Sequence, residues 1–160
     1  MTSARSFGGS RSSADTRWVC TWCSCSLYAA PLAANTSALA GLPANERALV
    51  TCEGAFSYLA RDAGLVERYI WPVNAEQQAT PQQIAATIEF VNEKDVPAVF
   101  CESTVSDKAM QQVVDATGAE FGGILYVDSL SAPDGPVPTY LDLIRHDADT
   151  IVAGLTGAAP

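Results

Sequence analysis

Short apolar runs alternate with amphipathic stretches from about residue 45 onward. Four of these runs are predicted to be buried strands, at residues 48–52, 69–71, 98–101 and 124–127. The segments between and after them are predicted to be helices, at residues 55–63, 81–93, 107–117 and 139–155. This order predicts an α/β domain with a four-stranded, mostly parallel sheet and helices on both faces.

Local signals place the helix ends. Thr80 before Pro81 is typical of an N-cap and first helical position, and Gly64 and Gly118 stand where helices commonly end. In the last helix the apolar side is expected to comprise Tyr140, Leu143, Ile144, Ile151 and Leu155, and the water-facing side Asp142, Asp147 and Asp149.

The first 44 residues have a different composition, rich in Ser, Arg, Cys and Trp and without sustained periodicity. Residues 1–44 are therefore expected to be an atypical, poorly ordered leader, and residues 45–160 an α/β lobe. Cys20 and Cys23 have zinc-like spacing, but no second pair supplies four ligands. Residues 18–34 resemble a signal peptide only in part, because cysteines and Pro31 interrupt the apolar stretch.

Charge is distributed unevenly along the chain. The net charge is −9, with +2 on residues 1–44 and −11 on residues 45–160. Such an acidic body disfavours nucleic acid or an anionic membrane surface as a partner and suits cations. No run of eighteen apolar residues is present, so no membrane-spanning helix is expected.

Acidic side chains follow three of the predicted strands: Glu53, Glu102 and Asp128. The carboxyl ends of parallel strands meet at one edge of a sheet, where α/β proteins bind ligands. Carboxylates brought together there repel each other unless a cation lies between them, so a divalent metal is the first hypothesis. Each acid also has a local interpretation, as a helix cap or turn residue, and a Mg²⁺-dependent enzyme with a flavodoxin-like or receiver-like fold would use the same three acids.

Nucleophilic catalysis has little support in the sequence. His146, the only histidine, lies in the last predicted helix between acidic neighbours and is expected to be a solvated surface residue. Cys52 and Cys101 lack a nearby basic activator and are expected to be small apolar fillers, although a disulfide between them stays open. Trp71 is expected to pack at a sheet end or at a boundary with another domain.

Five strings carry a resemblance to a known family: VTCEGAFSYLARDAGL, YIWPVNAEQQATPQQI, PAVFCESTVSDKAM, GILYVDSLS and PTYLDLI. Together they resemble the carboxy-terminal lobe of the metal-binding receptors of bacterial ABC importers, the adhesin B or zinc-uptake-protein A-like family. That resemblance implies a two-lobed fold with one metal in the cleft. It also implies that Glu53 and Asp128 are metal ligands and that Glu102 supports the site.

The resemblance further implies an extracytoplasmic, non-enzymatic protein that delivers its metal to an ABC permease. Glutamate rather than histidine at position 53 favours Mn²⁺, with Zn²⁺ and Fe²⁺ as alternatives. The amino-terminal lobe and its two histidines have no counterpart here, so a missing lobe or a second chain is expected to complete the site. A folded remnant without transport activity is the alternative. Apolar surface facing the missing lobe is expected around Trp71 and residues 133–138.

Overall fold

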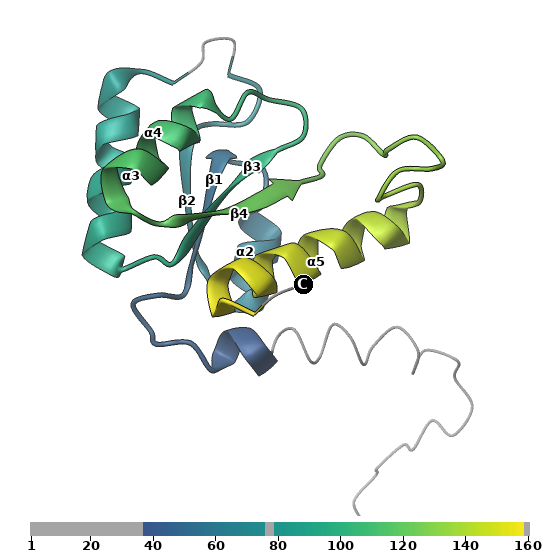
Figure 1. Ribbon diagram of the computed structural model, residues 1–160, viewed down its shortest axis with the longest axis horizontal. Coiled ribbons are helices and arrows are strands. Elements are labelled where there is room, and N and C mark those ends of the chain that lie inside the picture. Colours follow the sequence, from purple (N-terminus) through teal and green to yellow (C-terminus); the bar gives the residue numbers. More distant parts are fainter. Residues whose placement is uncertain (1–36, 76–78, 159–160) are drawn as a thin grey trace, which may run out of the picture.

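Strands and helices alternate along the part of the chain described by the computed structural model, residues 37–75 and 79–158 (Figure 1). In chain order the elements are β1 (Ala48–Glu53), α2 (Ser57–Ala63), β2 (Val66–Trp71), α3 (Pro81–Lys94), β3 (Ala98–Glu102), α4 (Lys108–Thr117), β4 (Glu120–Leu125) and α5 (Tyr140–Thr156). Residues 37–40 form a helical turn before β1. The order confirms the predicted α/β class.

The strands pair in two parallel ladders, β1 with β2 and β3 with β4. Glu53 lies opposite Trp71 in the first ladder, and Glu102 lies opposite Leu125 in the second. The inner strands β1 and β3 lie side by side (Figure 1), but the Glu53 N–H donates to the Glu102 carboxylate rather than to a backbone oxygen. The predicted parallel strands are confirmed, as two hydrogen-bonded pairs instead of one continuous four-stranded ladder.

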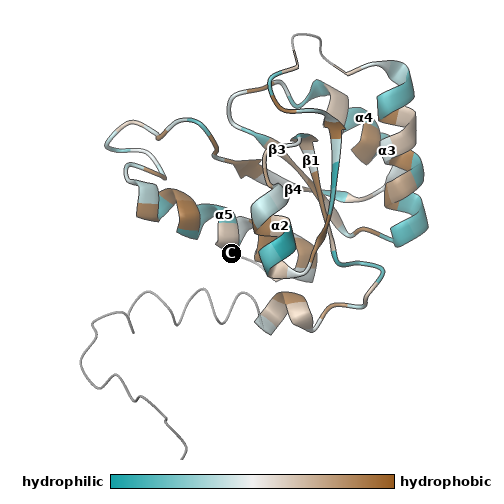
Figure 2. Ribbon diagram, turned by 180° about the vertical axis from the view of Figure 1, so that it is seen from behind, coloured by the Kyte–Doolittle hydropathy of each residue, from teal (hydrophilic) through white to brown (hydrophobic). Residues whose placement is uncertain are grey.

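Helices cover both faces of these strands, as predicted. Helices α3 and α4 lie on one face, and α2 and α5 lie on the other (Figure 1). Successive side chains of a strand point to opposite faces, so the residues of β3 alternate between two cores. Val99 and Cys101 pack in the α3/α4 cluster, whereas Ala98 and Phe100 pack with Ile151 of α5. Figure 2 shows these strands as predominantly apolar between the helices, which explains why they read as continuous hydrophobic runs.

Several helix ends lie where the sequence signals predicted. Helix α3 begins at Pro81, and Thr80 caps it through a reciprocal pair: Thr80 Oγ1 accepts the Gln83 N–H at 3.3 Å, and Gln83 Oε1 accepts the Thr80 N–H at 2.8 Å. Gly64 and Gly118 follow α2 and α4 with φ of 70° and 75°. That left-handed conformation favours glycine over residues with a Cβ atom.

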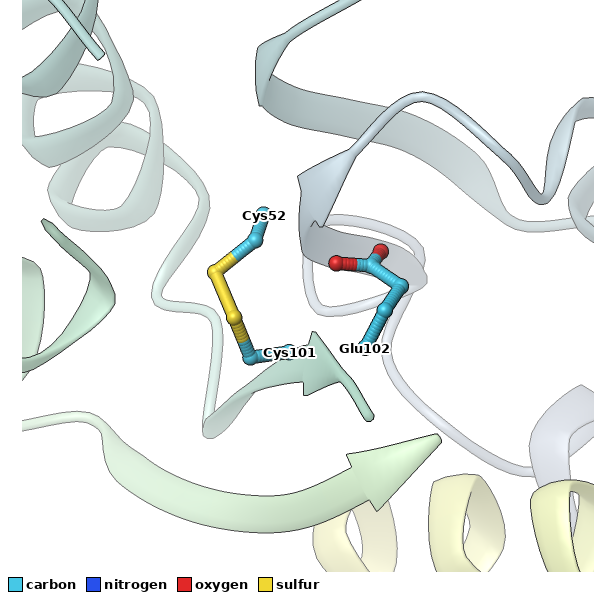
Figure 3. A group of neighbouring side chains, drawn as sticks. All are labelled: Cys52, Cys101 and Glu102. Carbon is cyan, nitrogen blue, oxygen red and sulfur yellow. A yellow bond between two sulfur atoms is a disulfide. The ribbon is translucent and has the colours of Figure 1, made fainter. Parts of the chain in front are cut away.

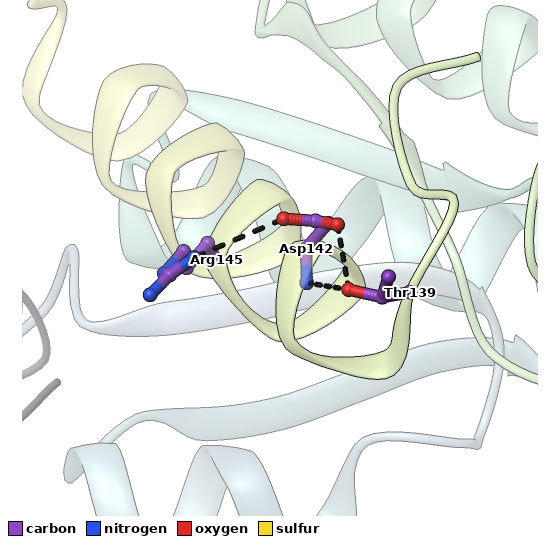
Figure 4. A network of polar contacts seen from close by, with 3 residues as sticks. All are labelled: Thr139, Asp142 and Arg145. Carbon is purple, nitrogen blue, oxygen red and sulfur yellow. Dashed lines mark hydrogen bonds and ion pairs between the residues drawn. The ribbon is translucent and has the colours of Figure 1, made fainter. Parts of the chain in front are cut away.

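A polar group at its first turn fixes the start of α5 (Figure 4). Thr139 Oγ1 accepts the Asp142 N–H at 3.2 Å, and the Thr139 hydroxyl donates to Asp142 Oδ2 at 2.6 Å. Arg145 Nη1 lies 3.8 Å from Asp142 Oδ1. The negative charge of Asp142 also stabilises the positive end of the helix dipole.

The predicted bounds of two elements were wrong. Strand β2 begins at Val66 instead of residue 69, because the Val66 N–H already donates to Arg47 O at 2.8 Å. Helix α2 begins at Ser57 instead of residue 55.

The predicted last strand, residues 124–127, was also wrong. Pairing starts earlier, where the Glu120 N–H donates to Pro97 O at 2.9 Å. It also stops earlier, because the Tyr126 N–H is bound by the Asp147 carboxylate at 2.8 Å. The acid at position 128 therefore follows a connecting segment and does not end the strand itself.

Residues 1–36 lie outside the described part of the chain, and so do the predicted cysteine cluster at Cys20 and Cys23 and the partial signal-peptide pattern at residues 18–34. Within the described residues, Leu39 is 5% exposed and packs with Leu49 in the α2/α5 core. None of the helices described there has both the length and the apolar character needed to cross a membrane.

Candidate metal centre

Glu53 is the last residue of β1 and stands at the carboxyl edge of the strands. Its side chain is half-buried, and Oε1 accepts the Asn74 N–H at 3.0 Å. Asn74 adopts a left-handed conformation, with φ of 58°, which turns the loop after β2 toward this carboxylate. The chain leaves β1 through Gly54, whose N–H donates to Trp71 O at 3.0 Å. The glutamate is thus held by backbone at the rim of the fold.

Glu102 occupies the equivalent position at the end of β3, but its side chain is fully buried. Its two carboxylate oxygens lie 3.2 and 3.1 Å from the Glu53 nitrogen, and both accept that N–H. Burial raises the pKa of Glu102 from its ordinary 4.5 to about 7, opposed by backbone hydrogen bonds from Glu102 and Glu53 and reinforced by the charge of Glu53. This carboxylate therefore contacts the backbone that carries Glu53.

Asp128 is exposed and is the third residue after β4. It lines a cavity of about 450 Å³ together with the residues that follow Glu53, from Gly54 to Leu59. Tyr126 and Tyr140 line the same cavity. The structure therefore brings the Asp128 segment and the chain leaving Glu53 to one hollow at the carboxyl edge.

Asp147 also lines this cavity, and sequence reasoning missed it. The prediction that it faces water was wrong, because Asp147 is 2% exposed and its Oδ1 accepts the Tyr126 N–H. Burial raises its pKa from 3.8 to about 6, against the lowering effects of that hydrogen bond and of His146. A signal was present in the sequence, since Asp147 lies four residues after Leu143 and four before Ile151, on the buried stripe of α5.

His146 is half-buried, so the expectation of a solvated surface residue was wrong. Its Nε2 lies 3.2 Å from Ile124 O, and its ring meets the Tyr126 ring edge-on with centroids 5.3 Å apart. These contacts attach α5 to the end of β4, and His146 lines a separate cavity of about 450 Å³.

Cys52 and Cys101 form a disulfide between β1 and β3, which settles the alternative left open by the sequence (Figure 3). Their Cα atoms are 4.9 Å apart, and both residues are fully buried. Their ligand atoms and those of Glu102 all lie within 4.8 Å of one another, the one close group of three or more His, Cys, Asp or Glu side chains among residues 37–75 and 79–158. Disulfide sulfurs are not thiolates, so this group does not offer the ligands that a metal prefers.

The Mg²⁺-enzyme alternative required Glu53, Glu102 and Asp128 around one ion. In the described part of the chain these three side chains do not form a group with ligand atoms within 4.8 Å of one another. Glu102 is instead buried against the Glu53 backbone. The geometry thus disfavours a three-carboxylate magnesium site.

Exposed apolar side chains surround the cavity at Asp128, notably Tyr58 (78% exposed), Tyr140 (68%) and Val73 (46%). Trp71 itself is 4% exposed and packs in the α3/α4 core, but Val73, two residues further along the chain, belongs to this exposed surface. The two tyrosines come from α2 and α5, so both helices contribute to the apolar rim of the cavity.

Comparison with known proteins gives consistent matches. The family described as zinc-uptake complex component A, periplasmic, matches residues 32–154. Iron-binding protein YfeA of Yersinia pestis is 57% identical over 116 residues, covering 72% of this chain and 37% of YfeA. Manganese-binding lipoprotein MntA of Halalkalibacterium halodurans is 34% identical over 115 residues, covering 72% of this chain and 38% of MntA.

A solved structure, the Mn-bound S38A mutant of a periplasmic metal binding protein from Candidatus Liberibacter asiaticus, superposes with a TM-score of 0.73 at 39% identity. The superposed part covers 79% of this chain and 47% of the Liberibacter chain. The fold and these matches define the class: an α/β lobe that is similar to part of the periplasmic metal-binding proteins. The chain belongs to the family of the periplasmic zinc-uptake component A. It spans well under half the length of the curated relatives it matches.

Proposed function

We propose that this chain provides one wall of an extracytoplasmic metal receptor that captures Mn²⁺ and presents it to an ABC permease. Glu53 and Asp128 would be its two ligands on this lobe. The observation that carries the proposal is the cavity at the carboxyl edge, which is lined both by Asp128 and by the residues that directly follow Glu53. The similarity to metal-binding proteins supports the same function.

The ligand chemistry favours manganese over softer ions. Carboxylate oxygens suit Mn²⁺, whereas thiolate ligands select zinc or Cu(I), and the two buried cysteines are tied up as a disulfide. Relatives are described as iron-binding, manganese-binding and zinc-uptake proteins, so Fe²⁺ and Zn²⁺ are the competing cargoes. Oxygen ligands from one wall alone bind such ions weakly, because water fills the remaining positions.

A second surface would complete the metal shell, supplied by another lobe or another chain. The exposed rim formed by Tyr58, Val73 and Tyr140 supports this step, because apolar surface around a polar cavity is typical of a face that becomes covered. Closure of that second surface over the carboxyl edge of the strands would exclude water from Glu53 and Asp128 and strengthen their interaction with the metal.

The disulfide supports an extracytoplasmic location. Disulfides persist in oxidising compartments such as the bacterial periplasm and are rare in a reducing cytosol. The bond between Cys52 and Cys101 joins two central strands and is fully buried, which is typical of a structural disulfide.

A Mn²⁺ titration of the full chain, followed by electron paramagnetic resonance, tests the proposal. Glu53→Ala and Asp128→Ala should each weaken binding at least about tenfold, since each removes a direct ligand. Asp115→Ala removes an exposed acid on α4 and is the matched control, with unchanged affinity expected. Binding that is insensitive to both ligand variants, or equally sensitive to the control, would show that Mn²⁺ meets only diffuse negative charge.

A further inference from the structure

The segment that carries Asp128 leaves the ladder at a defined point. Leu125 is the last residue of β4, and its carbonyl accepts the Ser103 N–H at 2.8 Å. The next N–H, that of Tyr126, turns away from β3 and donates to Asp147 Oδ1 at 2.8 Å. A carboxylate on α5 therefore determines where pairing ends and where the connection to Asp128 begins.

The buried Tyr126 N–H needs a hydrogen-bond acceptor, and the side chain at position 147 supplies it. The Tyr126 N–H lies against the interior, and a buried N–H without an acceptor costs about 1–3 kcal/mol. Asp147 is the acceptor and is itself only 2% exposed, so its carboxylate has lost most of its contact with water. An apolar residue on the buried stripe of α5 would fill the space but leave the N–H unsatisfied.

Other contacts make α5 a rigid frame for this hydrogen bond. His146 Nε2 lies 3.2 Å from Ile124 O, and the His146 ring packs edge-on against Tyr126. The helix is fixed at its start by the Thr139 cap shown in Figure 4 and at its end by Leu155 in the core. A shift of the chain at position 126 would therefore break its contacts with α5.

We propose that Asp147 is a positioning residue of the metal site: its carboxylate holds Tyr126 so that Asp128 stands over the cavity beside the chain leaving Glu53. The inference rests on the proposed function, because it assigns Asp147 a role through Asp128. Asp147 lines the same cavity, so direct metal ligation is the competing role that a test must separate.

Two substitutions separate position from charge. Asp147→Asn keeps an acceptor oxygen at the same distance from the backbone and removes the charge, so Mn²⁺ affinity should stay within about threefold of wild type. Asp147→Glu keeps the charge and moves the carboxylate by one methylene group, so affinity should fall about tenfold. The reverse pattern, with the Asn variant as weak as Asp128→Ala, would overturn the proposal in favour of a ligand or charge role.

The Tyr126 backbone amide gives a second readout that does not depend on metal. Hydrogen exchange followed by NMR at neutral pH should show a protected Tyr126 N–H in wild type and Asp147→Asn, and faster exchange in Asp147→Glu. Unchanged exchange and unchanged Asp128 amide shifts in the Glu variant would overturn the inference. If wild type binds no Mn²⁺ through Glu53 and Asp128, the proposed function fails, and this amide still decides whether Asp147 holds the segment.

Discussion

Glu102→Gln should stabilise the metal-free protein at pH 8 and leave its stability at pH 4.5 nearly unchanged. The reason is the buried carboxylate of Glu102, whose pKa is raised by burial from 4.5 to about 7. In the native state this group still holds its proton at pH values where the unfolded chain has released it. The free energy of unfolding therefore falls as the pH rises from about 4.5 to about 7, and it stays at the lower value above that window.

The size of the effect follows from the pKa change. One pKa unit is worth about 1.4 kcal/mol, so a rise from 4.5 to about 7 corresponds to roughly 3 kcal/mol lost between the ends of the window. Glutamine is neutral at every pH and, like the protonated acid, has one acceptor oxygen for the Glu53 N–H. The variant should thus match wild type at pH 4.5 and exceed its stability by about 2–3 kcal/mol at pH 8.

Urea unfolding followed by far-UV circular dichroism, with a metal chelator present, measures this difference at several pH values. Glu120→Gln is the matched control, because Glu120 is an exposed residue at the start of β4 and its substitution should change stability by less than about 0.5 kcal/mol. A Glu102→Gln stability difference that is the same at pH 4.5 and pH 8 would refute the reasoning, since the carboxylate would then carry no burial cost that depends on ionisation.

Two further predictions concern the core. Replacing both Cys52 and Cys101 by Ala should lower the free energy of unfolding by about 2–4 kcal/mol, because the disulfide closes a loop with a sequence separation of 49. A reductant should lower the urea midpoint of wild type but leave that of the double variant unchanged. Gly154→Ala should lower the free energy of unfolding by about 1–2 kcal/mol in the same assay, because the alanine Cβ would lie 2.8 Å from Phe100 Cζ. This loss is expected even though alanine favours helix over glycine by about 1 kcal/mol. A variant that is more stable than wild type would contradict this packing argument.

The order of elements was predictable because the signals for it are local. Buried strands covered on both faces read as apolar runs, and the Thr80 cap and the glycines at 64 and 118 mark helix ends within a few residues. Glu53 and Asp128 could likewise be proposed from their places after apolar runs, together with the family resemblance. Their roles as ligands stay predictions.

What the sequence did not predict depends on contacts between distant segments. The end of β4 was placed too late because its competitor for the Tyr126 N–H, Asp147, is 21 residues away and looks like an ordinary polar helix residue. The pairing of Cys52 with Cys101 needed knowledge that β1 and β3 are neighbours. Helical spacing from Leu143 would have placed Asp147 on the buried stripe.

The same dipeptide, Cys-Glu, ends both inner strands, and the structure uses its two copies differently. The cysteines Cys52 and Cys101 point toward each other and join the strands (Figure 3). The Glu102 carboxylate lies close to this disulfide, within 4.8 Å of its sulfurs, whereas Glu53 reaches the rim, where a backbone N–H from the β2–α3 loop holds one of its oxygens. Glu102 remains inside and binds the backbone of Glu53. Its buried charge lowers stability above pH 7, and its hydrogen bonds fix the backbone of Glu53, the residue that we propose as a metal ligand.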